Sequence, residues 1–453
     1  MSLISKLTSL AAAGSGGAAY WLLEYGNSAA GTLESYSAKT SVDSLGNLIA
    51  GTSVFGLGSG DIEAAISSIA PDGSFNWSKL LTVSGDDRGR STFVDGSDNY
   101  YIVGQYYVPD AYGHREYIAK FNNSGTVIWH KFAGGPSGAT NSSPTGYDIA
   151  VDTSGNVYTV GKQDYTGYAD LYISKYNSSG ILQWSRAMNK GTNLSSQVWC
   201  VACDNVDAIY SGGYEEKIYN NYSLATMRKT YVASGVGNWE KVLALAPSGY
   251  QDSHTYGNSC DGTDVYFCGR AYDDPAGANK GFVNSLACVG GAENWFTTCG
   301  TTSGYPLLRS THVGSDGYLY VVGEWVSDSS TVFFRLDIST GVVDWQLKIK
   351  HATANIAYSK GIAYDPNTDS IYVTGYANAS GNWNPFALRL PADGSVTGTF
   401  GDWTVSNPSM TFAYGSGTYY SVGYSDPTWT PTTGTSGQTV STPTYTLENL
   451  SAL

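Results

Sequence analysis

The sequence predicts an all-β fold built from repeated units of four short strands. In seven places a glycine is followed four residues later by a tryptophan, and successive tryptophans lie 50 to 56 residues apart. A second series of apolar or aromatic runs that end in glycine has eight copies, out of phase with the first. A period near 50 residues, made of short strands, is typical of a radial array of four-stranded blades. We therefore expect a single β-propeller.

The first series assigns a structural role to the tryptophans. Each glycine falls in the turn before the outer strand of a blade, so the indole four residues later can reach the neighbouring blade. A buried indole brings a large apolar area and an N–H group that needs a partner. A degenerate eighth copy contains Trp403. The predicted blade anchors are Trp21, Trp77, Trp129, Trp184, Trp239, Trp295, Trp345 and Trp403.

The third unit illustrates the expected blade. Strands are predicted at 148–151, 157–161, 172–176 and 181–186, separated by turns rich in Asp, Asn, Ser and Gly. An Asp-led turn follows the first strand of most units, as at Asp43. Each copy offers only one or two carboxylates, whereas a calcium ion takes six to eight oxygens. We therefore interpret these aspartates as caps of their own turns and expect no metal site.

The eighth glycine-ended strand predicts an eighth blade. Its first three strands would come from the C-terminal segment, and its outer strand from the N-terminus, so that the ring closes and both sheet edges are hidden. The alternative is a seven-bladed ring followed by an unrelated tail, residues 408–453. Under either count residues 1–16 are a separate extension and residues 17–453 form the propeller. The four predicted strands of the closing blade are Met410–Tyr414, Tyr419–Gly423, Tyr445–Leu450 and Tyr20–Tyr25.

The composition restricts the function. Charged residues make up 14% of the chain, below the average of about 25%, and the net charge is −14. Nucleic-acid phosphates and anionic membrane surfaces both attract basic proteins, so neither is an expected partner. No run of 18 apolar residues is long enough to span a bilayer. The six cysteines are expected to be small buried residues, with local disulfides, for instance between Cys288 and Cys299, or a metal site as the alternatives.

One motif resembles a known superfamily. Residues 337–345 (DISTGVVDW) match the tryptophan-docking pattern D-x-x-T-G-x-x-x-W of the quinoprotein dehydrogenase-like propellers. That resemblance implies an eight-bladed ring. The quinone enzymes of this superfamily stack their cofactor on a pair of adjacent cysteines, and this sequence contains no Cys-Cys dipeptide. We therefore expect neither the quinone cofactor nor the dehydrogenase activity.

The opening of the chain resembles a second group of proteins. Residues 1–14 (MSLISKLTSLAAAG) are similar to the start of virion structural proteins of tailed phages that infect marine bacteria, including cyanobacteria. This resemblance implies a non-enzymatic tail or capsid appendage, located in the virion and present in several copies, that docks on other virion proteins through residues 1–16. The alternative is a secreted bacterial binding module whose first 13 residues are cleaved as a weak signal peptide.

The loops between the second and third strands are the predicted recognition face. Tyrosine presents a large area and a polar tip with few rotatable bonds, which suits binding of a protein or of host-surface glycans. The paired acids Asp86-Asp87 and Asp273-Asp274 suggest a polysaccharide hydrolase as a less favoured function. The predicted face consists of Tyr106, Tyr107, Tyr112, Tyr165, Tyr168, Tyr219, Tyr222, Tyr272, Trp325, Trp383 and Trp429.

Overall fold

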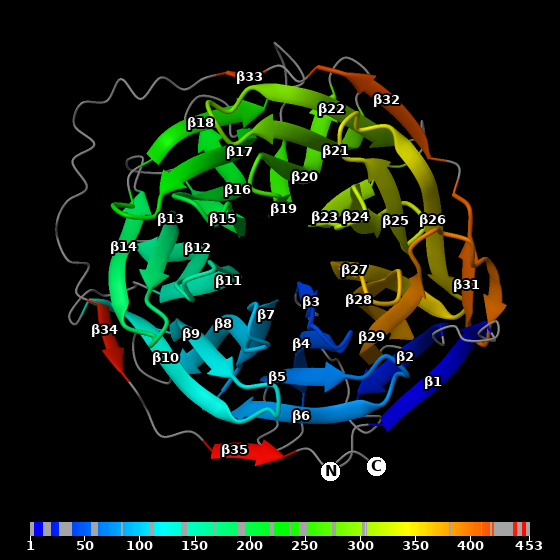
Figure 1. Ribbon diagram of the computed structural model, residues 1–453, viewed down its shortest axis with the longest axis horizontal. Helices are drawn as coiled ribbons and strands as arrows, with labels where there is room; N and C mark the ends of the chain where they lie inside the picture. The colour runs from blue at the N-terminus through cyan, green and yellow to red at the C-terminus, as the bar shows by residue number, and fades with distance from the viewer. Residues whose placement is uncertain are drawn as a thin grey trace.

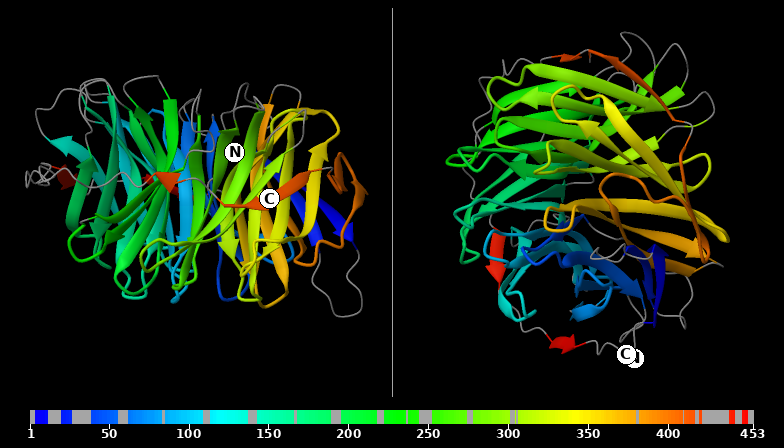
Figure 2. Two further views of the ribbon diagram at one scale, coloured as in Figure 1. Left: turned by 90° about the horizontal axis from the view of Figure 1, so that it is seen from above. Right: turned by 45° about the vertical axis from the view of Figure 1, so that its right-hand side comes forward.

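The computed structural model is a ring of seven antiparallel sheets around a central axis (Figure 1). Seen from the side, the ring is a disc whose thickness the strands cross (Figure 2). The part of the chain that the structure describes contains strands and no helix, and therefore no helix able to cross a membrane. The described residues are 4–11, 20–26, 39–55, 62–82, 85–108, 113–136, 143–165, 168–188, 195–217, 222–235, 237–243, 252–273, 278–300, 304, 306–379, 382–408, 410–416, 419–420, 438–441 and 446–449.

Each blade has four strands, which cross the thickness of the disc and are arranged in order from the axis to the rim. Blade 1 has β3 (Thr40–Val42), β4 (Leu48–Phe55), β5 (Ile62–Ile69) and β6 (Phe75–Thr82); blade 2 has β7 (Arg88–Val94), β8 (Tyr100–Val108), β9 (Gly113–Phe121) and β10 (Val127–Pro136). Blade 3 has β11 (Ser143–Val151), β12 (Val157–Tyr165), β13 (Tyr168–Tyr176) and β14 (Leu182–Met188); blade 4 has β15 (Ser196–Cys203), β16 (Ala208–Lys217), β17 (Tyr222–Tyr231) and β18 (Gly237–Leu243). Blade 5 has β19 (His254–Cys260), β20 (Asp264–Asp273), β21 (Ala278–Ala287) and β22 (Glu293–Gly300); blade 6 has β23 (Pro306–Val313), β24 (Tyr318–Trp325), β25 (Ser330–Asp337) and β26 (Val343–His351).

Blade 7 combines three strands that follow blade 6 with one strand from the N-terminal region. Its inner three strands are β27 (Ala354–Asp365), β28 (Ser370–Ala379) and β29 (Asn382–Pro391), and its fourth is β2 (Tyr20–Gly26) from the N-terminal region. Trp21 pairs with Arg389 across this junction. An N-terminal strand therefore closes the ring, as the sequence predicted.

The all-β propeller of four-stranded blades is confirmed, with the alternative count of seven blades; the expected eighth blade is wrong. The N-terminal strand β2, which was predicted to complete the eighth blade, is instead the outer strand of blade 7 and closes the ring there. The three segments assigned to the eighth blade instead contribute β32 (Thr411–Gly415), β33 (Tyr419–Tyr420) and β35 (Thr446–Asn449), and each pairs with a different blade.

The C-terminal segment adds strands along the outside of the ring. β30 (Gly398–Phe400) and β31 (Trp403–Ser406) extend blade 6, while β32, β33, β34 (Gln438–Ser441) and β35 pair with the outer strands of blades 5, 4, 2 and 1 (Figure 1). On blade 7, β1 (Ile4–Ala11) pairs with β2. These additions give hydrogen-bond partners to backbone groups at sheet edges that would otherwise be open to pairing with another chain.

Neighbouring blades are joined by tryptophans. The indole of one blade lies over a positive-φ glycine in the turn after the third strand of the next, as Trp295 lies over Gly341. Its Nε1–H donates to a carbonyl in the same turn; the pairs are Trp21 to Pro71 (2.8 Å), Trp77 to Asn123 (3.0 Å), Trp129 to Ser178 (3.0 Å), Trp184 to Val232 (3.0 Å), Trp295 to Ile338 (2.8 Å) and Trp345 to Ala392 (3.0 Å).

Two tryptophans depart from this arrangement. At Trp239 the equivalent carbonyl, that of Cys288, accepts from Tyr210 and Lys229 instead, and Trp239 Nε1 has no hydrogen-bond partner among the described residues. Trp403 lies on the rim strand β31, where it packs against Phe386 and its indole N–H donates to Glu24. Trp403 therefore covers the junction between blades 6 and 7 at the rim of the ring.

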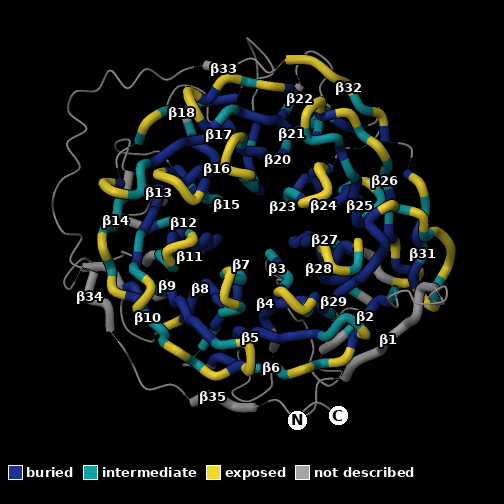
Figure 3. Tube along the Cα trace, in the orientation of Figure 1, coloured by how far each residue is buried: buried dark blue, intermediate teal, exposed yellow. Residues whose placement is uncertain are grey.

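The core lies between the blades, and exposed residues gather in the turns (Figure 3). The Asp-led turns are capped by their own side chains: Asp43 Oδ1 accepts from the backbone N–H of Leu45 (2.9 Å) and Asn47 (2.8 Å). The six cysteines are free, so no Cys288–Cys299 disulfide is formed. Cys288 Sγ instead lies 3.6 Å from Cys260 Sγ.

Candidate functional site

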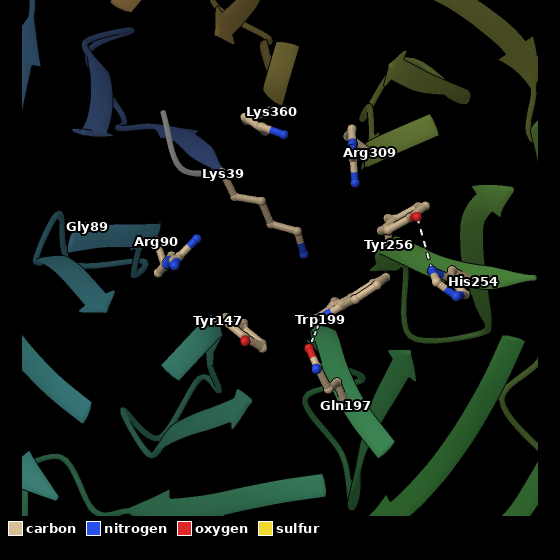
Figure 4. A pocket seen from close by; sticks show the side chains of 10 residues that line it. All are labelled: Lys39, Gly89, Arg90, Tyr147, Gln197, Trp199, His254, Tyr256, Arg309 and Lys360. Atoms are coloured by element: carbon tan, nitrogen blue, oxygen red, sulfur yellow. Dashed lines mark hydrogen bonds between the residues drawn. The ribbon is translucent and has the colours of Figure 1, made fainter. Parts of the chain in front are cut away.

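The inner strands of the ring share a local irregularity near the axis. In six of the seven, the pairing with the second strand skips one residue. A bulge of this kind leaves one residue unpaired and redirects its side chain. In blade 1, Lys39 precedes β3 and takes the same place. The seven residues are Lys39, Arg90, Tyr147, Trp199, Tyr256, Arg309 and Lys360, and all of them line one axial pocket (Figure 4).

The second glycine series explains why the bulges can form. Six of these glycines lie on the second strand opposite a bulge, and the missing side chain leaves room for an inner-strand carbonyl. A Cβ at Gly161 would lie 1.8 Å from the carbonyl oxygen of Thr145, and one at Gly213 would lie 1.9 Å from that of Gln197. The other four are Gly104, Gly269, Gly323 and Gly375, with backbone carbonyl oxygens at 2.0 to 2.5 Å.

We expect Gly161→Ala to destabilise the protein by about 3 kcal/mol, because the clashing atom is backbone and the inner strand must move. The bulged Tyr147 would move with it. Gly96→Ala is the matched control, since a Cβ there meets nothing within 4 Å. Urea unfolding of both variants measures the difference. Equal stability of the two would contradict this role of the glycine.

The seven residues divide the pocket into two halves. Around the ring, blades 6, 7, 1 and 2 contribute Arg309, Lys360, Lys39 and Arg90 in succession. The remaining three blades contribute aromatic rings, those of Tyr147, Trp199 and Tyr256. Four cations thus face three aromatic residues across the axis of a protein whose net charge is −14. The pocket has a volume of about 440 Å³.

A buried carboxylate holds two of the cations in place. Glu324, on β24, accepts from Arg309 Nε (2.9 Å) and Nη2 (3.0 Å) and from Lys360 Nζ (2.8 Å). Burial raises the pKa of Glu324, but Arg309 and Lys360 outweigh it and the net pKa is lowered. Burial and the nearby Arg309 lower the pKa of Lys360 to about 8. Two cations share one acid, so this side of the pocket has a surplus of positive charge.

A second carboxylate links four blades at the axis. Asp148 of blade 3 forms an ion pair with Lys39 of blade 1 and accepts from Ser91 Oγ of blade 2 (2.6 Å). It also accepts from the backbone N–H of Val201 in blade 4 (2.8 Å). Burial lowers the pKa of Lys39, but Asp148 outweighs it and the net pKa is raised. Lys39 therefore stays charged, and its amine reaches towards the middle of the pocket in Figure 4.

The aromatic half is held rigid by stacking. The rings of Trp199 and Tyr256 are parallel within 3°, with centroids 4.7 Å apart, and the guanidinium of Arg309 lies 4.3 Å from the Tyr256 centroid. The Tyr256 hydroxyl is 3.1 Å from His254 Nδ1, and Trp199 Nε1–H donates to Gln197 Oε1 (2.9 Å). Hydroxyl and amide groups therefore accompany the aromatic faces.

The space along the axis of the ring extends beyond this pocket. A second cavity of about 380 Å³ is lined by the remaining parts of the inner strands, and Lys39 borders both. The first pocket lies towards the end of the ring where second and third strands connect, because the bulge is near the start of β7, and Arg88, the first residue of β7, pairs with Gln105 in the second half of β8. This is the same end as the predicted recognition loops.

The predicted recognition residues differ in how far their side chains are buried. Tyr106 and Trp325 are buried, so their rings cover the core; Tyr106 packs on Phe132, with ring centroids 4.0 Å apart. Tyr107 is 37% exposed, and Tyr272 and Trp383 are half-buried. Tyr165, Tyr168 and Tyr222 lie in strands but their side chains are outside the described residues, as are Tyr112, Tyr219 and Trp429 entirely.

The paired acids of the hydrolase hypothesis are engaged in local structure where they are described. Asp86 Oδ1 accepts from the backbone N–H of Ile62 (3.2 Å), and Asp87 Oδ1 from that of Tyr107 (3.2 Å). Asp273 lies at the end of β20, and Asp274 is outside the described residues. Sequence reasoning missed the axial residues, although the second glycine series marked the bulges that position them.

Comparisons with known proteins found one matching family model and several distantly similar structures. A model of a repeat family described as "Beta-propeller repeat" matches residues 128–162. The propeller domain of the Trilobed protease from Pyrococcus furiosus, described with an open velcro topology, is 10% identical with a TM-score of 0.45, over 79% of this chain and 95% of that one. Sqt1 from Chaetomium thermophilum is 11% identical (TM-score 0.45; 86% and 93%). The phage phi92 endosialidase is 12% identical (TM-score 0.43; 86% and 69%). No curated protein matches.

Proposed function

We propose that this protein is a non-enzymatic binding module of a tailed-phage particle, which recognises a host-surface ligand in its axial pocket. The observation on which the proposal depends is the half-cationic, half-aromatic pocket. All seven blades contribute to it, and its residues are fixed by bulges and ion pairs before any ligand arrives. Such preorganisation reduces the entropy that binding must offset.

The carboxylates at the pocket support binding rather than hydrolysis. A glycoside hydrolase needs one carboxyl group that keeps its proton. Glu324 has a lowered pKa and holds two cations, and Asp148 holds Lys39 and two further donors. Both acids therefore act as supports for the pocket cations.

The attachment to the particle is proposed for residues 1–16. Their resemblance to the opening of phage virion proteins supports it, as does the place of β1. Among the described residues β1 pairs with β2 alone, so its other edge offers backbone groups to a strand of another virion protein. Several copies on one particle would give a multivalent contact with the host surface.

Mass spectrometry of purified particles tests this function. We expect the chain in them with its N-terminus at or next to Met1, and we expect particles that carry Trp199→Ala to adsorb to host cells more slowly than the parent. Absence of the chain from particles would defeat the proposal. A mature N-terminus after Ala13 in the culture medium would favour a secreted bacterial module instead.

A further inference from the structure

We infer that the axial pocket binds an acidic sugar unit, a six-membered ring with a carboxylate such as a hexuronic or sialic acid, at the end of a surface glycan. This inference specifies the ligand of the proposed function and rests on it for the biological setting. The pocket volume of about 440 Å³ suits one or two sugar rings, because small-ligand sites commonly occupy about 300–1,000 Å³.

The charge of the pocket selects an acid. Arg309 and Lys360 share the single carboxylate of Glu324, which leaves a surplus positive charge beside the cavity. Lys39 also projects into the pocket, although Asp148 balances its charge. A carboxylate placed among these groups gains charge-assisted hydrogen bonds. A mononucleotide brings two or more negative charges, which fits a modest surplus in a chain of net charge −14 less well.

The opposite half of the pocket selects a ring with hydroxyl groups. Sugars present apolar C–H faces that pack on aromatic side chains and hydroxyls that need polar partners. Tyr147 and the stacked Trp199 and Tyr256 provide the aromatic wall. Gln197 and His254, which also line the pocket, provide polar groups within the same wall. One ligand that is acidic on one side and a polyol on the other satisfies both halves.

The site also predicts a pH dependence. Lys360 faces Arg309, Glu324 and the ring of Tyr376, whose centroid is 5.3 Å from Nζ, and it senses the charge of Arg90. Its pKa of about 8 means that it loses its proton between about pH 7 and pH 9. An anion prefers the charged amine, so affinity should fall as the pH rises through this range. The raised pKa values of Lys39 and Arg309 keep those groups charged.

Isothermal titration of the purified full chain tests the ligand class. The probes are tri-galacturonate and sialyllactose, the neutral trisaccharide of galactose, inorganic sulfate and ADP, all at pH 7. We expect at least one acidic saccharide to bind about tenfold or more tightly than each of the other three. Binding of sulfate or of the neutral sugar with equal affinity, tighter binding of ADP, or no binding of either acidic saccharide would each overturn the inference.

Variants locate the site. Lys360→Met and Trp199→Ala should each weaken acidic-saccharide binding about tenfold or more, and Lys360→Met should also abolish the fall in affinity between pH 7 and pH 9. Lys350→Met is the matched control, because Lys350 is an exposed cation on the outer strand β26. Thermal unfolding establishes that each variant is folded. Unchanged affinity in both folded pocket variants would place the site elsewhere and overturn the inference.

These measurements need no phage particle. Acidic-saccharide binding by a chain that is absent from particles would defeat the proposed function and leave the ligand assignment standing. A chain present in particles whose axial pocket ignores acidic sugars would do the reverse.

Discussion

Deleting residues 1–26 should open the ring and abolish cooperative folding. The deletion removes β2, the outer strand of blade 7, together with Trp21, Leu22 and Leu23, each 1% exposed. Truncating one buried tryptophan or leucine to alanine costs about 2–5 kcal/mol, so loss of all three reaches the whole stability of a typical domain, about 5–15 kcal/mol. Circular dichroism and urea unfolding would report the loss.

Two variants test whether the loss of stability comes from opening the ring or only from shortening the chain. Deleting residues 1–16 removes β1 and keeps β2, so we expect a cooperative transition to remain. Trp21→Ala keeps the strand and should cost about 3–5 kcal/mol, because it empties the contact with Tyr372 and leaves the Pro71 carbonyl without the indole N–H. A cooperative transition in the 1–26 deletion, as steep as that of the full chain, would show that blade 7 does not depend on β2.

Replacing Glu324 by glutamine should cost about 3–5 kcal/mol. The carboxylate is 3% exposed and binds both Arg309 and Lys360, and removing one partner of a buried ion pair leaves uncompensated charge beside the pocket. Part of the cost belongs to Lys360, whose native pKa is about 8. Above that pH the amine is neutral in both proteins, so this part of the difference should vanish as the pH rises, while the part due to Arg309 remains.

Asp344→Asn is the matched control for this substitution. Asp344 also binds an arginine, Arg335, but its side chain is 44% exposed, and exposed ion pairs contribute about 0–1 kcal/mol. The measurement is urea unfolding of both variants at pH 7 and pH 9.5. A cost for Glu324→Gln as small as that for Asp344→Asn would contradict the view that Glu324 holds the pocket cations.

The sequence predicted the blades because their determinants are local. A glycine of positive φ, such as Gly341, must precede the outer strand, and an indole must follow four residues later to reach the next blade. These requirements recur in blades 1 to 6 and leave a period that can be read without coordinates. The Asp-led turns are local in the same sense, since the side chain of Asp43 caps its own turn.

The blade count and the candidate site were decided by the tertiary structure. Closure pairs Trp21 with Arg389, near opposite ends of the chain, and local patterns do not reveal which C-terminal strand meets β2. The segment after β29 therefore resembles an eighth blade in sequence while its strands extend other blades along the rim. The pocket residues likewise lie one to a blade, and only the bulges turn them towards a common axis. The sequence by itself thus determined the repeated blade and its indole contacts, because these depend on residues within one or two units. The number of blades and the charged, aromatic axis depend on all seven units at once, so only the closed ring defines them.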